Sequence, residues 1–174
     1  MKHITILVPQ GAILGSLEGS RQRLTQVNQF AKAKGAKPLF QVQLVGLSHE
    51  IKLSGGSFTA HADRLIDEVK KTDLIIIPAL DGDIQKAIET NRDFIPWIIK
   101  QYQRGAEVAS LCLGAFLLAS TGLLKGRQCA THWLATNEFR QLFPDVNLVT
   151  ERIITDEQGI YTNGGGYSFL NLII

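Results

Sequence analysis

Short apolar runs alternate with amphipathic segments along the chain. The clearest run, residues 73–78, is almost entirely apolar, which predicts a strand buried on both faces at the centre of a parallel sheet. Residues 39–46 alternate between apolar and polar side chains instead, so this strand is expected near an edge of the sheet. Further strands are predicted at 3–8, the first half of 107–119, 128–133, 147–150, 153–155 and 160–162.

Helices are predicted where apolar residues recur at spacings of three and four positions. These segments are 16–34, 59–71, 94–104, the second half of 107–119 continuing to Thr121, 134–143 and the start of a helix at 167–174. Asp93 is the expected N-cap of the 94–104 helix, and residues 51–58 are expected to form a small hairpin. This alternation predicts an α/β fold with a doubly wound, mostly parallel sheet sandwiched by helices, of the flavodoxin-like type.

One stretch, Glu107 to Ala119, changes from strand to helix at Cys112. Small residues stand two positions before and two positions after the cysteine, at Ser110 and Gly114. This is the spacing of a nucleophile elbow, a sharp turn that brings neighbouring backbones too close for larger side chains. Such a turn presents the Cys112 thiol at the carboxyl end of the sheet, beside a helix N-terminus that favours the thiolate. The alternative is that Cys112 is a small buried hydrophobic residue in a strand-helix corner.

Composition narrows the classes of protein that this chain can represent. Of its 174 residues, 45% are hydrophobic and 20% are charged, as is ordinary for one globular domain with a sizeable core. The net charge is +2, without the basic block typical of a nucleic-acid-binding tail. Two cysteines do not make a disulfide framework, so a cytoplasmic location is expected. We recognise no signal peptide, membrane-spanning run, metal-binding cluster or cofactor fingerprint, so no metal, cofactor or membrane partner is expected.

The last residues, Asn171 to Ile174, are apolar and carry no helix stop signal. A natural protein rarely ends part-way through a buried helix. We therefore expect that these residues belong to a longer chain, or that the reading frame is truncated.

Three motifs make the sequence resemble a known family. They are Ser110-Leu111-Cys112-Leu113-Gly114-Ala115-Phe116-Leu117-Leu118-Ala119, Gly122-Leu123-Leu124-Lys125-Gly126-Arg127 and Thr131-His132-Trp133. From Ile4 to its last residue, the chain resembles the ThiJ/PfpI superfamily, which has the class I glutamine amidotransferase-like fold. Within it, the motifs are most similar to the N-terminal domain of AraC-type transcription regulators. The resemblance implies a homodimeric domain that senses a small-molecule effector, with DNA bound by a helix-turn-helix domain outside residues 1–174.

The resemblance also implies a site around the elbow. His132 is expected beside Cys112, where an imidazole can accept the thiol proton or hold the thiolate. Enzymes of the superfamily often carry a histidine directly after the cysteine and an acidic residue after the first strand. Here these positions are Leu113, which cannot transfer protons, and Ser16, which is not acidic. Glu18 is two positions further along the predicted helix and should face elsewhere.

Backbone amides complete the expected ligand site. The 79–83 loop stands where the superfamily has its oxyanion-hole glycines, so the Gly82 and Leu113 amides could face a bound anion or carbonyl. Gly165, in the triplet at 164–166, could present a further amide at the start of the last predicted helix. For each glycine, an ordinary turn is the alternative. The expected ligand-binding residues are therefore Ser16, Gly82, Cys112, Leu113, His132 and Gly165.

Three functions remain open from the sequence. The first is the ligand-sensing and dimerising domain of an AraC-family DNA-binding transcription regulator, with its small-molecule pocket at the Cys112 elbow. The second is a cysteine-dependent ThiJ/PfpI-type enzyme, such as an amidase, hydratase or glyoxalase-like enzyme, with Cys112 as nucleophile and His132 as base. The third is a redox sensor in which Cys112 is oxidised. Leu113 and Ser16 favour a non-catalytic sensor over an enzyme.

Overall fold

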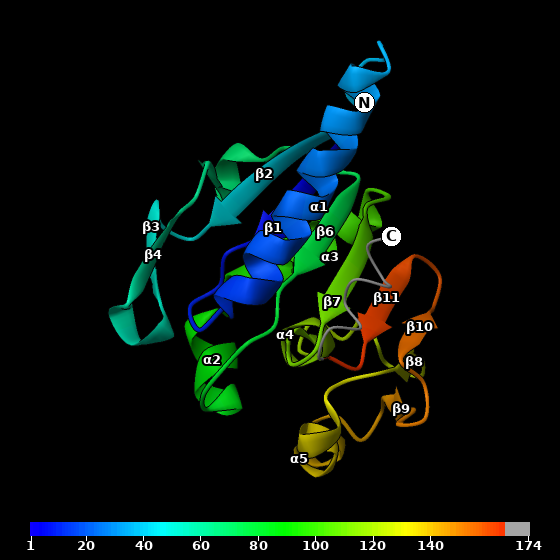
Figure 1. Ribbon diagram of the computed structural model, residues 1–174. Coiled ribbons are helices and arrows are strands. Elements are labelled where there is room, and N and C mark those ends of the chain that lie inside the picture. The colour runs from blue at the N-terminus through cyan, green and yellow to red at the C-terminus, as the bar shows by residue number, and fades with distance from the viewer. Residues whose placement is uncertain (166–174) are drawn as a thin grey trace.

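A seven-stranded sheet forms the centre of the structure, a computed structural model in which residues 1–165 are described. The strand order is β10-β11-β7-β6-β1-β2-β5, and every neighbouring pair is parallel except β10 and β11 (Figure 1). The strands are β1 Lys2–Leu7, β2 Phe40–Gly46, β5 Arg64–Leu65, β6 Leu74–Ile77, β7 Glu107–Leu111, β10 Ile154–Asp156 and β11 Ile160–Asn163. The prediction of a mostly parallel α/β sheet with residues 73–78 near its centre is therefore confirmed.

Helices cover both faces of this sheet. They are α1 Leu14–Ala33, α2 Ile84–Thr90, α3 Phe94–Gln103, α4 Gly114–Ala119 and α5 Thr136–Leu142, with short 3-10 turns η1 Ser54–Gly56, η2 Ile66–Glu68 and η3 Trp133–Ala135. The sheet has a hydrophobic core on each face, and β6 contributes to both. Ile75 and Ile77 belong to one core, with Phe94 of α3 and Phe116 of α4. Ile76 belongs to the other, with residues of α1. Because side chains of a strand alternate between faces, one apolar run supplies both clusters.

Two small sheets lie outside the central one. The strands β3 Glu50–Leu53 and β4 Phe58–His61 form the predicted antiparallel hairpin, and β8 Gln128–Cys129 pairs in parallel with β9 Asn147–Leu148. No helix among residues 1–165 is both long and apolar enough to cross a membrane. The helix predicted at 167–174, and Gly166 before it, lie outside the described residues.

The predicted helix at 59–71 is wrong. This segment forms β4, β5 and the turn η2 instead. The reason is tertiary: the Asp63 carboxylate accepts the Leu44 N–H at 2.7 Å, and the Asp63 N–H donates to the Leu44 carbonyl at 2.8 Å. Pairing with β2 and with the hairpin therefore overrides the helical spacing of the segment's apolar residues.

Capping around α2 and α3 also differs from the prediction. Asp93 stands at the N-cap position of α3, but its side chain makes no capping hydrogen bond. The Phe94 N–H donates instead to the carbonyl of Asn91 at 3.0 Å. Asp83 is the N-cap residue of α2, because its carboxylate accepts the Lys86 N–H. The sequence pattern did not predict this helix.

Candidate functional site

Cys112 lies in the turn between β7 and α4, with a backbone φ of 53°. This left-handed conformation costs a non-glycine residue about 1–2 kcal/mol, so its surroundings must hold it in place. The Cys112 N–H donates to the carbonyl of Asn163, at the end of β11, at 3.1 Å. The Thr131 hydroxyl donates to the Cys112 carbonyl at 3.1 Å. Two segments distant in sequence therefore secure the turn from both sides of the peptide unit.

The small residues on either side of Cys112 are required by packing. A Cβ at Gly114 would lie 2.4 Å from the Pro78 carbonyl oxygen and 2.9 Å from that of Ile77. Such distances do not occur in real structures, so α4 can begin this close to the end of β6 only with glycine. Ser110 is fully buried between β6 and β11, and its hydroxyl has no hydrogen-bond partner among the described residues. This is the backbone arrangement of a nucleophile elbow.

Gly165 and His132 lie beside the Cys112 sulfur. A Cβ at Gly165 would be 2.8 Å from Cys112 Sγ and 3.0 Å from His132 Cδ2. Since Cys112 Sγ and His132 Cδ2 both lie within about 3 Å of this Cβ position, the two atoms are at most about 6 Å apart. The structure thus brings together three of the residues predicted at this site, from three segments of the chain.

The imidazole of His132 offers a hydrogen-bond donor toward this space. Its Nδ1 accepts the Leu134 N–H at 3.3 Å, so a neutral ring carries its hydrogen on Nε2. Nε2 is bonded to Cδ2, the ring atom beside Gly165. The ring stacks on Trp133, with ring centres 5.8 Å apart, which limits its rotation. A neutral ring in this tautomer has a donor on Nε2, whereas the lone pair on Nδ1 accepts from the backbone.

Two backbone amides follow Cys112 at the elbow, on half-buried Leu113 and buried Gly114. Within residues 1–165, the N–H groups of Leu113 and Gly114 have no hydrogen-bond partner. They follow Cys112 directly, at the point where α4 begins. Adjacent N–H donors next to a nucleophile elbow are the arrangement that stabilises a bound carbonyl or carboxylate oxygen.

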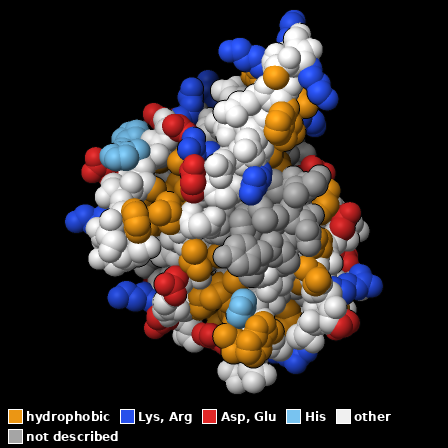
Figure 2. Space-filling view, viewed as in Figure 1, with side chains coloured by type: hydrophobic (Ala, Val, Ile, Leu, Met, Phe, Trp, Pro, Cys, Tyr) orange, Lys and Arg blue, Asp and Glu red, His pale blue; other side chains and the backbone are white. Residues whose placement is uncertain are grey.

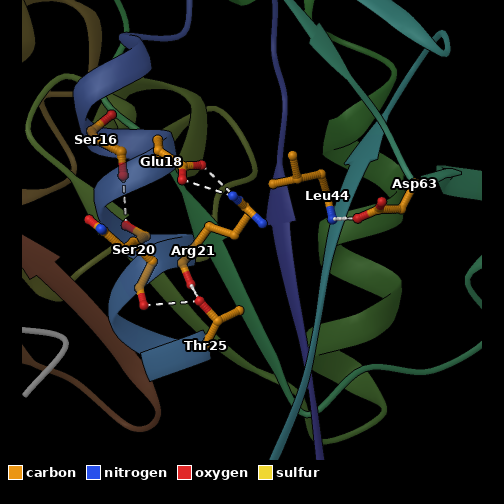
Figure 3. Close-up of polar contacts among 8 residues, drawn as sticks. Ser16, Glu18, Ser20, Arg21, Thr25, Leu44 and Asp63 are labelled. Atoms are coloured by element: carbon orange, nitrogen blue, oxygen red, sulfur yellow. Dashed lines mark hydrogen bonds and ion pairs between the residues drawn. The ribbon is translucent and has the colours of Figure 1, made fainter. Parts of the chain in front are cut away.

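Ser16 occupies the position at which the family resemblance implies an acidic residue in the enzymes. Here its side chain has a structural role. Its hydroxyl donates to the Ile13 carbonyl at 2.8 Å and accepts the Ala79 N–H at 3.0 Å. These bonds tie the start of α1 to the loop after β6. Glu18 does not replace the missing acid, because its carboxylate forms a two-point ion pair with Arg21 on α1, at 2.7 and 2.8 Å (Figure 3).

Gly82 lies in a different environment from the other predicted ligand-binding residues. Its N–H donates to the Asp81 carboxylate at 2.8 Å, so this amide is already engaged. A Cβ at Gly82 would have no heavy atom within 4 Å. Gly82 lines a cleft of about 370 Å³ together with the 11–13 loop and the tip of the β3–β4 hairpin.

The second cysteine, Cys129, is a buried thiol that does not ionise near neutral pH. Cys129 is fully buried, and this burial raises the pKa of its thiol to about 12. Its thiol donates to the Ala130 carbonyl at 3.5 Å. Among the described residues, no group of three or more His, Cys, Asp or Glu side chains could hold a metal ion.

Thr131 and Asn163 are the positioning residues that the sequence did not single out. Both act on the backbone of Cys112 from strands or loops that only the fold brings close. For Thr131 a signal existed, because it belongs to the Thr131-His132-Trp133 motif. For Asn163 the contact uses its main-chain carbonyl, which no side-chain pattern encodes.

A sequence model of the DJ-1/PfpI family matches residues 26–172 of the chain. The chain belongs to the DJ-1/PfpI family. The ThiJ/PfpI resemblance seen in the elbow and Thr-His-Trp motifs is thereby confirmed. The family assignment fits the elbow geometry at Cys112, although it does not by itself decide between catalysis and binding.

Most of the curated relatives are named as HTH-type transcriptional regulators. The HTH-type transcriptional regulator GbdR of Pseudomonas aeruginosa is 23% identical over 171 residues, which cover 98% of this chain and 44% of GbdR. The HTH-type transcriptional regulator CdhR of the same species is 25% identical over 122 residues, which cover 70% of this chain and 35% of CdhR. The chain spans less than half the length of these relatives.

Solved structures share the fold. An AraC family transcriptional regulator from Pseudomonas putida superposes with a TM-score of 0.77 at 14% identity, covering 99% of this chain and 89% of that one. A candidate transcriptional regulator from Vibrio parahaemolyticus gives 0.86 at 21% identity, covering 99% and 88%. At these identities the comparison establishes the fold alone.

Proposed function

We propose that residues 1–174 are the effector-sensing, dimerising domain of an AraC-type transcription regulator, whose helix-turn-helix domain lies outside this sequence. The observation that carries the proposal is the match to GbdR, which runs along 98% of this chain but only 44% of that regulator. In this proposal the effector binds at the Cys112 elbow, and DNA is bound by the other domain. Effector binding changes DNA binding only if the effector has different affinities for two arrangements of the protein.

The chemistry of the elbow supports a binding role. Leu113 cannot transfer a proton, and the Ser16 hydroxyl, which lacks the acidity of a carboxyl group, is engaged in structural hydrogen bonds. The His132 lone pair on Nδ1 is directed to the Leu134 N–H. Among residues 1–165, the imidazole beside the cysteine therefore has its basic nitrogen engaged, which favours binding over general-base catalysis.

The available donors indicate what kind of effector fits. The Leu113 and Gly114 N–H groups and His132 Nε2–H are all donors. A ligand with a carbonyl or carboxylate oxygen would satisfy them. In this proposal Ser16 and Gly165 shape the site through their positions, whereas the Gly82 amide, which Asp81 engages, contributes no donor to it.

The cysteine-enzyme alternative has one observation in its favour, which is the strained φ of Cys112 beside an imidazole. It predicts turnover that Cys112→Ala abolishes. An absence of turnover with amides, isocyanides and 2-oxoaldehydes would exclude it for these substrate classes.

The test of the regulator proposal uses the protein made by the native cell. An antibody to residues 1–174 should detect a product more than twice this length, as in the relatives. That product should shift its own promoter DNA in a gel, and residues 1–174 alone should not. A native product of about 19.2 kDa, or sequence-specific DNA binding by residues 1–174, would contradict the proposal.

A further inference from the structure

The second half of α1 extends past the end of the sheet. A 20-residue helix is about 30 Å long, whereas the six-residue strand β1 beneath it spans about 20 Å. The buried residues of α1 accordingly all lie at or before Leu24. Figure 1 shows the helix end projecting beyond the strands. Residues 25–33 therefore present their side chains outside the core.

This projection carries exposed hydrophobic side chains. Met1 is 70% exposed, Phe30 66%, Leu39 51% and Val27 37%. Hydrogen bonds join the three chain segments that carry these residues. The Leu39 N–H donates to the Asn28 side chain at 2.9 Å, and the Leu39 carbonyl accepts the Lys2 N–H at 2.8 Å. We call these four residues the apolar tip.

Positive charge gathers beside the apolar tip, at the end of α1, whereas Glu68 and Asp73 lie near Met1 on its other side. No aspartate or glutamate occurs between Glu18 and Glu50, whereas this interval holds Arg21, Arg23, Lys32, Lys34 and Lys37. The whole chain has a net charge of only +2, so the rest of it is net negative. Lys32, Lys34 and Lys37 are exposed. Figure 2 shows Lys and Arg side chains gathered at the end of the projecting helix, next to hydrophobic ones.

Strand addition beside the tip is blocked at two positions of β2. The Asn28 side chain accepts the Phe40 N–H at 3.0 Å and donates to the Phe40 carbonyl at 2.6 Å. Asp63 engages both the N–H and the carbonyl of Leu44. A partner must therefore bind through the side chains of the tip and not by pairing with this edge.

A second copy of the chain is a poor match for this surface. In a symmetric contact the same patch lies on both copies, so Lys32, Lys34 and Lys37 of one copy would approach a surface that carries the same positive charge. Like charges that meet in an interface oppose binding. An acidic partner, in contrast, gains from these lysines and can cover the exposed hydrophobic side chains.

We propose that the apolar tip is a docking surface for an acidic amphipathic helix of another protein. The apolar face of that helix packs on Phe30 and Leu39, and its carboxylates lie near Lys32, Lys34 and Lys37. This is a helix-on-helix recognition mode in which apolar anchors supply affinity and charge supplies selectivity. The proposal does not depend on the effector site or on the regulator assignment.

The test measures binding of a synthetic amphipathic peptide, with leucine on one face and glutamate on the other, by fluorescence anisotropy. Phe30→Ala and Lys34→Glu should each weaken binding by at least about fivefold, as expected for anchor residues. Phe58→Ala is the matched control, since Phe58 is 53% exposed but lies on β4, away from the tip. A peptide with lysine in place of glutamate should not bind, and added salt should weaken the glutamate peptide.

Three results would overturn this proposal. The first is peptide binding that neither Phe30→Ala nor Leu39→Ala changes. The second is binding of duplex DNA that depends on Lys34 but not on Phe30, which would make the tip a polyanion site. The third is a dimer in sedimentation equilibrium that Phe30→Ala dissociates, which would make a second copy the occupant. All these substitutions are at exposed positions, so the fold should be retained.

Discussion

Gly165 is packed directly against the sulfur of Cys112. A Cβ at this glycine would lie 2.8 Å from Cys112 Sγ and 3.2 Å from Cys112 Cβ. The two residues are far apart in sequence, and the contact exists because β11 runs parallel to β7 and ends beside the elbow. A side chain at Gly165 would therefore clash with the thiol and with the edge of the His132 ring.

Gly165→Ala should block access to Cys112. The new Cβ would lie 2.8 Å from Cys112 Sγ, so the variant should lose about 1–3 kcal/mol of unfolding free energy, as overpacking typically costs, and alkylation of the native Cys112 thiol by iodoacetamide should be slower than in the wild type. Gly126→Ala is the control, because Gly126 also has a positive φ of 71° but a Cβ there meets nothing within 4 Å. Cys129 should not react at mildly alkaline pH, since burial raises its pKa to about 12. Equal rates for the two alanine variants would show that Gly165 does not limit access.

Gly114→Ala should destabilise the fold. The new Cβ would lie 2.4 Å from the Pro78 carbonyl oxygen, so α4 or β6 must shift, at a cost of about 1–3 kcal/mol. Gly15→Ala, in α1 with nothing within 4 Å, should instead stabilise the protein by about 0.5–1 kcal/mol through helix propensity. Urea unfolding of both variants measures this difference. A Gly114→Ala variant as stable as Gly15→Ala would mean that the elbow can relax.

Asp63→Ala should open the outer edge of the sheet. The substitution removes the acceptor of the Leu44 N–H, leaving an unpaired donor on the part of β2 that the short edge strand β5 does not cover, where another chain can pair. We expect faster aggregation, measured by light scattering on mild heating. Asp67→Ala is a suitable control, because Asp67 is an exposed carboxylate in η2 and not in β2 or β5. Similar aggregation of the two variants would show that Asp63 does not protect the edge.

Acid should weaken the fold partly through Asp73. The His3 N–H donates to the Asp73 carboxylate at 2.7 Å, and this bond lowers the pKa of Asp73 in the folded protein. A carboxylate whose pKa is lowered by folding stabilises the protein above its unfolded pKa of about 3.9. That contribution is lost as the pH falls through the folded pKa. Asp73→Asn should therefore lose less stability than the wild type between about pH 5 and pH 2, as measured by urea unfolding. Parallel losses would contradict this role.

The sequence by itself determined the class of the fold and the location of the elbow. Buried strands such as 73–78 and the change from strand to helix at Cys112 are local patterns of apolar and small residues. Local patterns survive folding when burial follows the same periodicity, which is why the parallel sheet could be predicted. The small residues at Ser110 and Gly114 likewise signal a tight turn that packing then requires.

Only the tertiary structure decided which distant residues meet. Residues 59–71 have helical spacing, yet hydrogen bonds between Asp63 and Leu44 fix part of this segment beside β2. The grouping of Cys112, His132 and Gly165, and the engagement of the Gly82 amide by Asp81, depend on loops that periodicity does not describe. The physical reason is that apolar periodicity records how deeply a segment is buried. It does not determine which distant segment each residue packs against.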